Sequence, residues 1–169
     1  MTNNPALANA FRFLLLLTVQ VLVFNRLNFF GFINPMVYIL FLYWYPIKEN
    51  RNLFLVLAFF LGFILDFFSD TMALHAAASL TIAYLRPTIM RFVFGVNYEF
   101  QSFKLSNSTR IQQFTFLTLL VITHHGIFFS LEIFSFSNLL LILKKVVFTG
   151  IGTIVICTLF ISLFGISRE

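Results

Sequence analysis

Two carboxylates and a histidine interrupt an otherwise apolar stretch of the chain, LDFFSDTMALHAAA at residues 65–78. Asp66 and Asp70 lie one helical turn apart and therefore share a helix face, and His75 follows five residues later. Acids and imidazoles are the groups that proteins use for proton transfer and metal binding. Their spacing here matches no recognised metal motif, so we expect no bound metal and no cofactor.

The composition of the chain defines the surroundings in which these groups must act. The 169 residues are 60% hydrophobic and only 10% charged, and the mean hydropathy is +0.95. A water-soluble domain needs more polar surface than this. The sequence therefore predicts an all-α integral membrane protein with one membrane domain over residues 1–169.

Apolar runs separated by polar turns predict a compact bundle of six transmembrane helices. Asn34 is expected to cap the second helix, with Pro35 at its first position. The fourth is expected to end at Arg86 and Pro87, and residues 88–96 to form a short amphipathic piece at the membrane surface. The expected helices cover about residues 11–25, 33–47, 53–68, 72–86, 111–131 and 138–164.

The distribution of basic residues gives this bundle an orientation. Arg26, Lys144 and Lys145 fall on one side, whereas a larger basic set falls on the side of both termini and of the polar loop at residues 97–110. By the positive-inside rule both termini are predicted to be cytoplasmic. The net charge of +5 then serves topology and attraction to anionic membrane lipid, and we expect no nucleic-acid binding. The larger set is Arg12, Lys48, Arg51, Arg86, Arg91, Lys104, Arg110 and Arg168.

The opening stretch falls at the outer end of the third and fourth helices. Asp70 directly precedes an apolar helical run and is expected to act as its N-cap. Asp66 is expected to make a polar contact within the bundle or with a partner, and Gly62, one turn earlier, allows close helix approach. With His75 these acids are predicted to form a polar joint between the two helices.

Other polar residues lie within or near the last two helices. His124 and His125 are adjacent, so they point about 100° apart, cannot share one metal, and at most one is expected to face the bundle core. Lys144 and Lys145 either extend to the lipid headgroups or pair with Glu132 or a partner.

No known catalytic signature occurs, and we do not expect an enzyme. The alternative to a scaffold is a small-molecule transporter or substrate-capture subunit, because polar residues inside short helices can line a pocket. Such a subunit should gather Gln20, Asp66, His75 and His124 around one cavity, whereas a scaffold can leave them scattered.

Five short motifs resemble the MreD family of bacterial rod shape-determining membrane proteins. They are NP at residue 34, YPIKENR at 45, GFILDFFSD at 62, LHAAA at 74 and AYLRP at 83. Related sequences commonly have Gly where this chain has Ala73. The motifs make Gly62, Asn34, Pro35, Arg86 and Pro87 candidate structural or partner-binding residues, together with Asp66, Asp70 and His75.

This resemblance implies a function that the residues alone do not give. It implies a non-enzymatic scaffold subunit of the cell-elongation machinery, or elongasome, in the bacterial cytoplasmic (inner) membrane, where peptidoglycan synthesis sets cell shape. The implied direct partner is MreC, with MreB, RodA and a penicillin-binding transpeptidase in the larger assembly. The implied fold resembles the substrate-binding subunits of energy-coupling-factor transporters.

Overall fold

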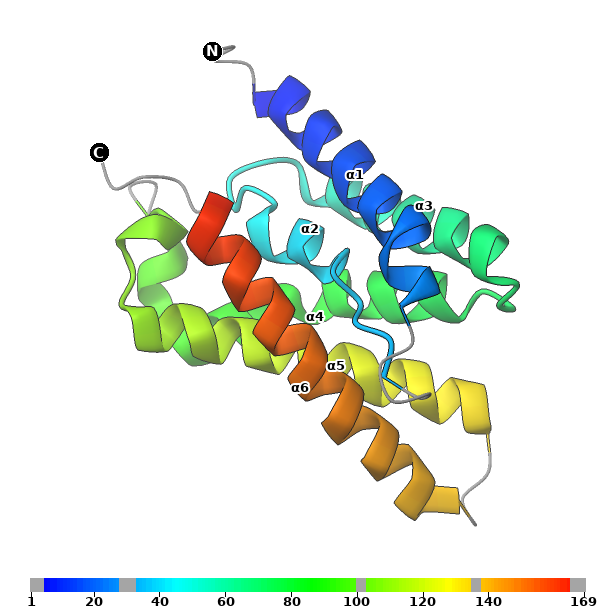
Figure 1. Ribbon diagram of the computed structural model, residues 1–169. Helices are drawn as coiled ribbons and strands as arrows, with labels where there is room; N and C mark the ends of the chain where they lie inside the picture. Colours follow the sequence, from blue (N-terminus) through cyan, green and yellow to red (C-terminus); the bar gives the residue numbers. More distant parts are fainter. Residues whose placement is uncertain (1–4, 28–32, 100–102, 135–137, 165–169) are drawn as a thin grey trace.

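A computed structural model describes residues 5–27, 33–99, 103–134 and 138–164, and most of this part of the chain is helical (Figure 1). Among the described residues, the short 3-10 turns η1 (Phe24–Arg26), η2 (Gly95–Glu99) and η3 (Leu105–Asn107) lie between the longer elements. The α-helices are α1 (Pro5–Leu22), α2 (Ile39–Trp44), α3 (Arg51–Ser69), α4 (Leu74–Phe94), α5 (Arg110–Ile133) and α6 (Leu139–Phe164).

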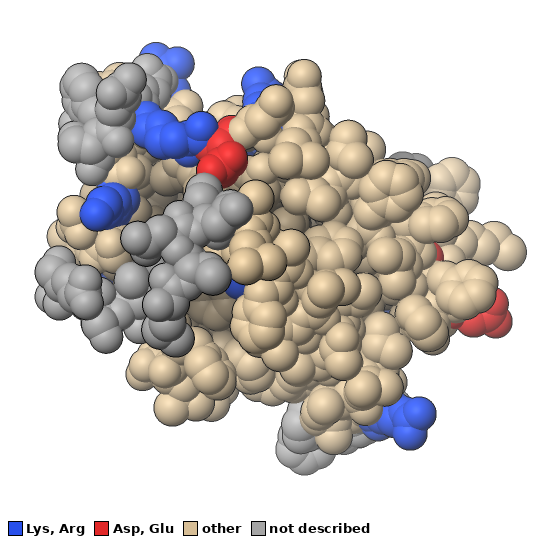
Figure 2. All heavy atoms as spheres, turned by 90° about the horizontal axis from the view of Figure 1, so that it is seen from above, with Lys and Arg blue, Asp and Glu red and all other residues tan. Residues whose placement is uncertain are grey.

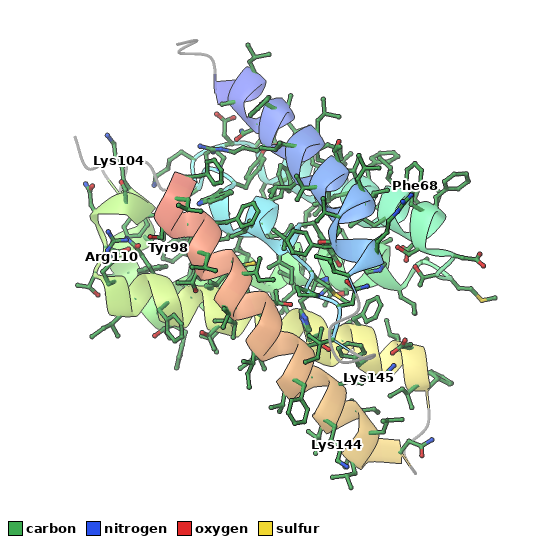
Figure 3. All side chains as sticks on the ribbon, viewed as in Figure 1. Phe68, Tyr98, Lys104, Arg110, Lys144 and Lys145 are labelled. Carbon is green, nitrogen blue, oxygen red and sulfur yellow. The ribbon has the colours of Figure 1, made fainter. Side chains whose placement is uncertain are left out.

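The helices form a bundle with two distinct ends. The start of α1, the end of α6 and the connection from α4 to α5 lie toward one end, and the turn from α3 to α4 lies toward the other (Figure 1). Figure 3 labels Arg110 and Lys104 at the first end and Lys144 and Lys145 at the second. We call these the Arg110 end and the Lys145 end. Helix α4 packs between α3 and α5, and α6 packs on α5.

Within the described ranges, four helical segments are long and apolar enough to cross a membrane, as expected for a multi-pass membrane protein. They are Ala6–Arg26, Arg51–Ser69, Arg110–Ile133 and Leu139–Phe164. Large apolar side chains such as Phe67 and Phe92 are exposed on the bundle surface, where lipid can solvate them. Most of the described surface in Figure 2 belongs to uncharged residues, and most of the Lys and Arg side chains visible there lie toward the upper left edge.

The predicted second helix at residues 33–47 is wrong in extent, because only Ile39–Trp44 is α-helical. Asn34 does not cap this helix: its N-cap is Tyr38, which makes no side-chain capping bond. Residues 35–38 are instead non-helical and buried. Non-helical backbone is tolerated at membrane depth only where protein surrounds it and satisfies its polar groups.

The predicted end of the fourth helix at Arg86 and Pro87 is also wrong, since α4 continues to Phe94. The separate surface piece expected at residues 88–96 is mostly the last part of this helix. Proline removes one helical hydrogen bond, but its fixed φ is compatible with a helix. Met90 and Phe94 are buried beyond the proline, and this packing favours continuation. The helix ends at Gly95, whose φ of 65° suits glycine.

The remaining helices lie close to their predicted ranges, apart from α1, which begins at Pro5. The side chain of Asn50 caps α3 by accepting from two backbone N–H groups. Thr109 and Gln112 form a reciprocal capping box at the start of α5, which defines the end of the predicted polar loop at residues 97–110. Within that loop, residues 100–102 lie outside the described part.

Candidate functional site

The carboxylate of Asp66 joins α3 to the first turn of α4. One oxygen accepts the hydroxyl of Thr71 at 2.5 Å and the backbone N–H of His75 at 2.9 Å, and the other accepts the N–H of Ala76 at 2.8 Å. The first N–H groups of a helix have no partner within the helix. Asp66 satisfies two of them for α4 and is 5% exposed, so the predicted contact within the bundle is present.

The prediction that Asp70 caps α4 is wrong. Asp70 is the C-cap of α3, with a left-handed φ of 53°, and its backbone N–H donates to the carbonyl of Asp66. Its side chain is exposed and makes no hydrogen bond within the described part of the chain. The N-cap position of α4 falls on Ala73, with φ of 58° and no capping side chain. The chain reverses so tightly that the cap comes from the previous helix.

Gly62 makes this arrangement possible by letting α3 and α4 touch. A Cβ atom at Gly62 would lie 2.5 Å from the backbone N and Cα of Ala76 and would overlap the carbonyl oxygen of His75. These are backbone atoms, which cannot rotate away as a flexible side chain can. The predicted close helix approach is therefore present, one turn from the Asp66 cap.

The hydroxyl of Tyr38 links two histidines inside the bundle. It lies 2.8 Å from Nδ1 of His75 and 2.8 Å from Nε2 of His124. Nδ1 of His124 is buried without a partner among the described residues. A proton there would be an unsatisfied donor, so the network favours Nε2–H on His124 donating to Tyr38, whose O–H donates to His75. The proton of neutral His75 then resides on Nε2.

His125 is buried as completely as His124, so the prediction that at most one faces the core is wrong. Helix α5 packs against both α4 and α6, so two directions about 100° apart both meet protein. His125 lies 3.0 Å from the carbonyl of Val121 and 3.1 Å from the hydroxyl of Thr153. That hydroxyl also accepts the backbone N–H of Met36 at 3.1 Å.

Gln20 of α1 makes hydrogen bonds to backbone groups of the buried segment at residues 35–38. Its side-chain oxygen accepts the N–H of Val37 at 2.7 Å, and its amide nitrogen donates to the carbonyl of Pro35 at 3.1 Å and to Asn25 at 3.0 Å. Sequence reasoning missed Tyr38 and Thr153, which look unremarkable in apolar runs. Only the folded chain brings them to groups far away in sequence.

Arg86 of α4 binds the carbonyl groups at the C-terminal end of α2. Its guanidinium donates to the carbonyls of Tyr43 at 3.3 Å and Tyr45 at 2.6 Å, and it lies over the ring of Phe54, 5.1 Å from the centroid. The last carbonyls of a helix favour a cation. Arg86 therefore has a structural role. Pro87, the next residue of α4, is half-buried.

The two lysines at the start of α6 have different surroundings. Lys145 pairs with Glu132 at 2.7 Å and lies over the ring of Phe129, 5.4 Å from the centroid. Lys144 is exposed at the same end of the bundle (Figure 3). Of the alternatives expected for these lysines, the pairing with Glu132 is therefore present for Lys145.

A pocket of about 400 Å³ opens at the Lys145 end. The neutral polar groups in its wall belong to α1, η1, the segment before α2, the end of α3 and the turn after it, the start of α4, and α6. Helix α5 contributes two aromatic rings and Glu132. Of the sequence candidates, Asn34, His75 and Lys145 line it. The full lining is Gln20, Asn25, Asn34, Met36, Phe68, Ser69, Thr71, His75, Phe128, Phe129, Glu132, Lys145 and Thr149.

Two polar atoms in this wall are buried and have no partner within the described ranges: Oδ1 of Asn34 and Oγ1 of Thr149. His75 uses Nδ1 for Tyr38, and its Nε2 makes no hydrogen bond to any described residue. The described residues contain no group of three or more His, Cys, Asp or Glu side chains able to hold a metal ion. The wall therefore carries hydrogen-bonding groups that have no partner among the described residues.

These features define a class, that of multi-pass helical membrane proteins with a polar pocket between the helix ends. Comparisons of the chain with protein-family models, with curated proteins and with solved structures find no match.

Proposed function

We propose that this protein is a non-enzymatic scaffold subunit of the bacterial cell-elongation machinery, placed in the cytoplasmic membrane with six spans and both termini inside. In this proposal it binds MreC directly and helps to position the wall synthases RodA and the penicillin-binding transpeptidase, with MreB on the cytoplasmic side. The Arg110 end, which carries Lys104 and Arg110, is then the cytoplasmic end (Figure 3).

The observation that carries the proposal is the place of the residues behind the MreD resemblance. Gly62 and Asp66 join α3 to α4, His75 bonds to Tyr38, and Arg86 holds the end of α2. Residues that fix helix packing in this way would give the members of a family a common helix arrangement. A shape held rigid at the Lys145 end is what a scaffold offers to a partner.

A second candidate function is the capture of a small molecule, and the pocket favours it. Gln20 and His75 line one cavity, and Asp66 is one hydrogen bond away through Thr71. His124 is two hydrogen bonds away, through Tyr38 and then His75. A capture subunit was expected to gather these four residues. Small-molecule capture and partner binding are compatible, because a segment of a partner protein can also bind in a pocket.

Affinity purification of the tagged protein in mild detergent, with mass spectrometric identification of the proteins that copurify, tests the first proposal. MreC is expected in the eluate, and depletion of the protein from a rod-shaped host is expected to produce round cells. Normal shape and normal cell-wall incorporation after depletion would overturn the scaffold proposal, and retention of a small molecule without MreC would favour the second.

A further inference from the structure

We infer that the pocket at the Lys145 end binds an uncharged, amide-bearing ligand with an apolar side group, the chemistry of a peptide segment. The inference deepens the proposed function by naming the place where a partner is held. It rests on that function only for the source of the ligand, which is either a partner's chain or a free small amide.

The charge of the pocket excludes a preference for ions. Among the described lining residues, only Glu132 and Lys145 carry a formal charge, and they neutralise each other at 2.7 Å. The other polar lining groups are amides, hydroxyls and one imidazole. An anion or a cation would have to break the existing ion pair to find a counter-charge, whereas a neutral guest leaves it intact.

Most of the polar groups in the wall are already satisfied by each other. The amide of Gln20 donates to Asn25, the amide of Asn25 donates to Ser69 at 2.8 Å, and the hydroxyl of Thr71 donates to Asp66. These bonds hold the wall in place. They also restrict recognition to the few groups that remain unpaired.

The unpaired groups form a mixed set of donors and acceptors. Oδ1 of Asn34 accepts, the hydroxyl of Thr149 donates or accepts, and Nε2–H of His75 donates. Thr149 is 1% exposed, so its hydroxyl has little access to bulk water in the free protein. A buried polar group without a partner is costly. An amide, which offers N–H and C=O together, satisfies both kinds of group at once when the Asn34 and Thr149 side chains rotate to turn these buried oxygens toward it.

The rest of the wall is apolar and selects the side group. Phe68, Phe128, Phe129 and Met36 line the same cavity, and the volume of about 400 Å³ accommodates an aromatic or aliphatic side chain beside an amide. Aromatic walls combined with a few unpaired polar groups are typical of ligand sites.

A labelling experiment on the full chain in detergent tests the inference. Cys157 is the only cysteine, so Cys157→Ala followed by Ser69→Cys gives one thiol at the pocket wall. The probe is N-acetyl-L-phenylalaninamide, and the readout is the rate of maleimide labelling. We expect the probe to slow labelling of Ser69→Cys and not of Asn138→Cys, which is exposed and does not line the pocket.

A matched pair of variants shows whether the unpaired hydroxyl is used. Thr149→Val keeps the shape of the side chain and is expected to weaken protection by the probe by about fivefold to tenfold, the value of one hydrogen bond. Thr118→Val removes another buried, unpartnered hydroxyl that does not line the pocket, and it should leave protection unchanged. Neither hydroxyl makes a hydrogen bond to any described residue of the free protein, so neither variant should impair folding.

Three results would overturn the inference: no protection by the probe, equal protection in the presence of Thr149→Val, or equal protection by charged L-phenylalanine. None of these depends on whether MreC copurifies, so failure of the pocket and failure of the scaffold function are distinguishable. In native membranes without probe, slow labelling of Ser69→Cys that accelerates on partner depletion identifies a partner's chain as the source. Labelling unaffected by depletion, in a protein that the probe protects, identifies a free small amide.

Discussion

The carboxylate of Asp66 on α3 accepts the backbone N–H of Ala76 on α4 at 2.8 Å, so one helix supplies the N-terminal cap of the next. Such caps usually come from the residue directly before the helix. Here the two helices are joined by hydrogen bonds as well as by packing. No residue of the short turn between them has to cap α4 with its side chain.

Asp66→Asn is expected to lower the free energy of unfolding by about 1–2 kcal/mol, because the amide replaces one acceptor oxygen by an NH₂ group that faces N–H donors. Thermal unfolding in detergent measures the loss. Asp70→Asn is the matched control and should change little, since the Asp70 side chain is exposed and asparagine tolerates its left-handed backbone. Equal losses for the two variants would contradict the assignment of the cap to Asp66.

Gly62→Ala is expected to destabilise the protein by about 1–3 kcal/mol, because the new methyl group overlaps the backbone of α4 and forces the helices apart. Gly126→Ala, within α5, has nothing within 4 Å of its added Cβ. It should be neutral or stabilise the helix by up to about 1 kcal/mol. Unfolding temperatures of the two variants, compared in the same detergent, check the contrast. A stable Gly62→Ala protein would argue against the close approach.

Ala73→Gly is expected to stabilise the protein by roughly 0.5–1 kcal/mol. Alanine at φ of 58° is strained by about 1–2 kcal/mol, and the greater freedom of glycine in the unfolded chain offsets only part of the relief. Ala77→Gly, in the first turns of α4, should instead cost about 1 kcal/mol. A loss of stability in Ala73→Gly would show that this turn does not hold a left-handed residue.

Arg86→Lys is expected to cost about 1–3 kcal/mol despite the conserved charge, because lysine lacks the planar group that donates to Tyr45 while lying over Phe54. Arg91→Lys, an exposed position on the same helix, should stay within about 0.5 kcal/mol of the wild type. Both are measured by thermal unfolding, and a neutral Arg86→Lys would exclude a specific guanidinium contact.

Reporter insertions test the proposed orientation independently of any partner. A reporter near Ser106 and one after Arg168 should both be active in their cytoplasmic form, whereas one near Ser135 should report the outer side. A cytoplasmic signal near Ser135 would refute six spans.

Local sequence patterns predicted the features that depend on neighbours along a helix. The spacing of Gly62 and Asp66 was enough to place a small residue and an acid on one face, and the structure brings both to α4. The same reasoning assigned the cap to Asp70, because it assumed that a helix is capped by the residue before it. Two residues of the tight turn are left-handed without being glycine. Asp70 gave no recognisable signal, whereas Ala73 stands where related sequences commonly have Gly.

Features that depend on distant partners were beyond local patterns. The residues after Pro35 resembled the start of a helix, but their N–H groups bond to Gln20 and Thr153, which belong to the first and last helices. The pocket is likewise assembled from segments that no periodicity relates. Of the amides that line it, Gln20 was expected at a cavity only in a capture subunit, and Asn34 was expected to cap a helix. The aromatic residues of the lining follow no pattern that separates them from other packing residues.

The bond between the N–H of Met36 and the hydroxyl of Thr153 joins residues 117 positions apart. During synthesis the segment at residues 35–38 emerges long before the helix that completes its surroundings. Until that last helix is made, the N–H of Met36 lacks this partner in an apolar medium, which is costly. The early segments are therefore expected to stay beside the translocon, or a chaperone of membrane insertion, and to enter lipid together with α6. Chains that stall before Thr153 should be preferred substrates for membrane proteases.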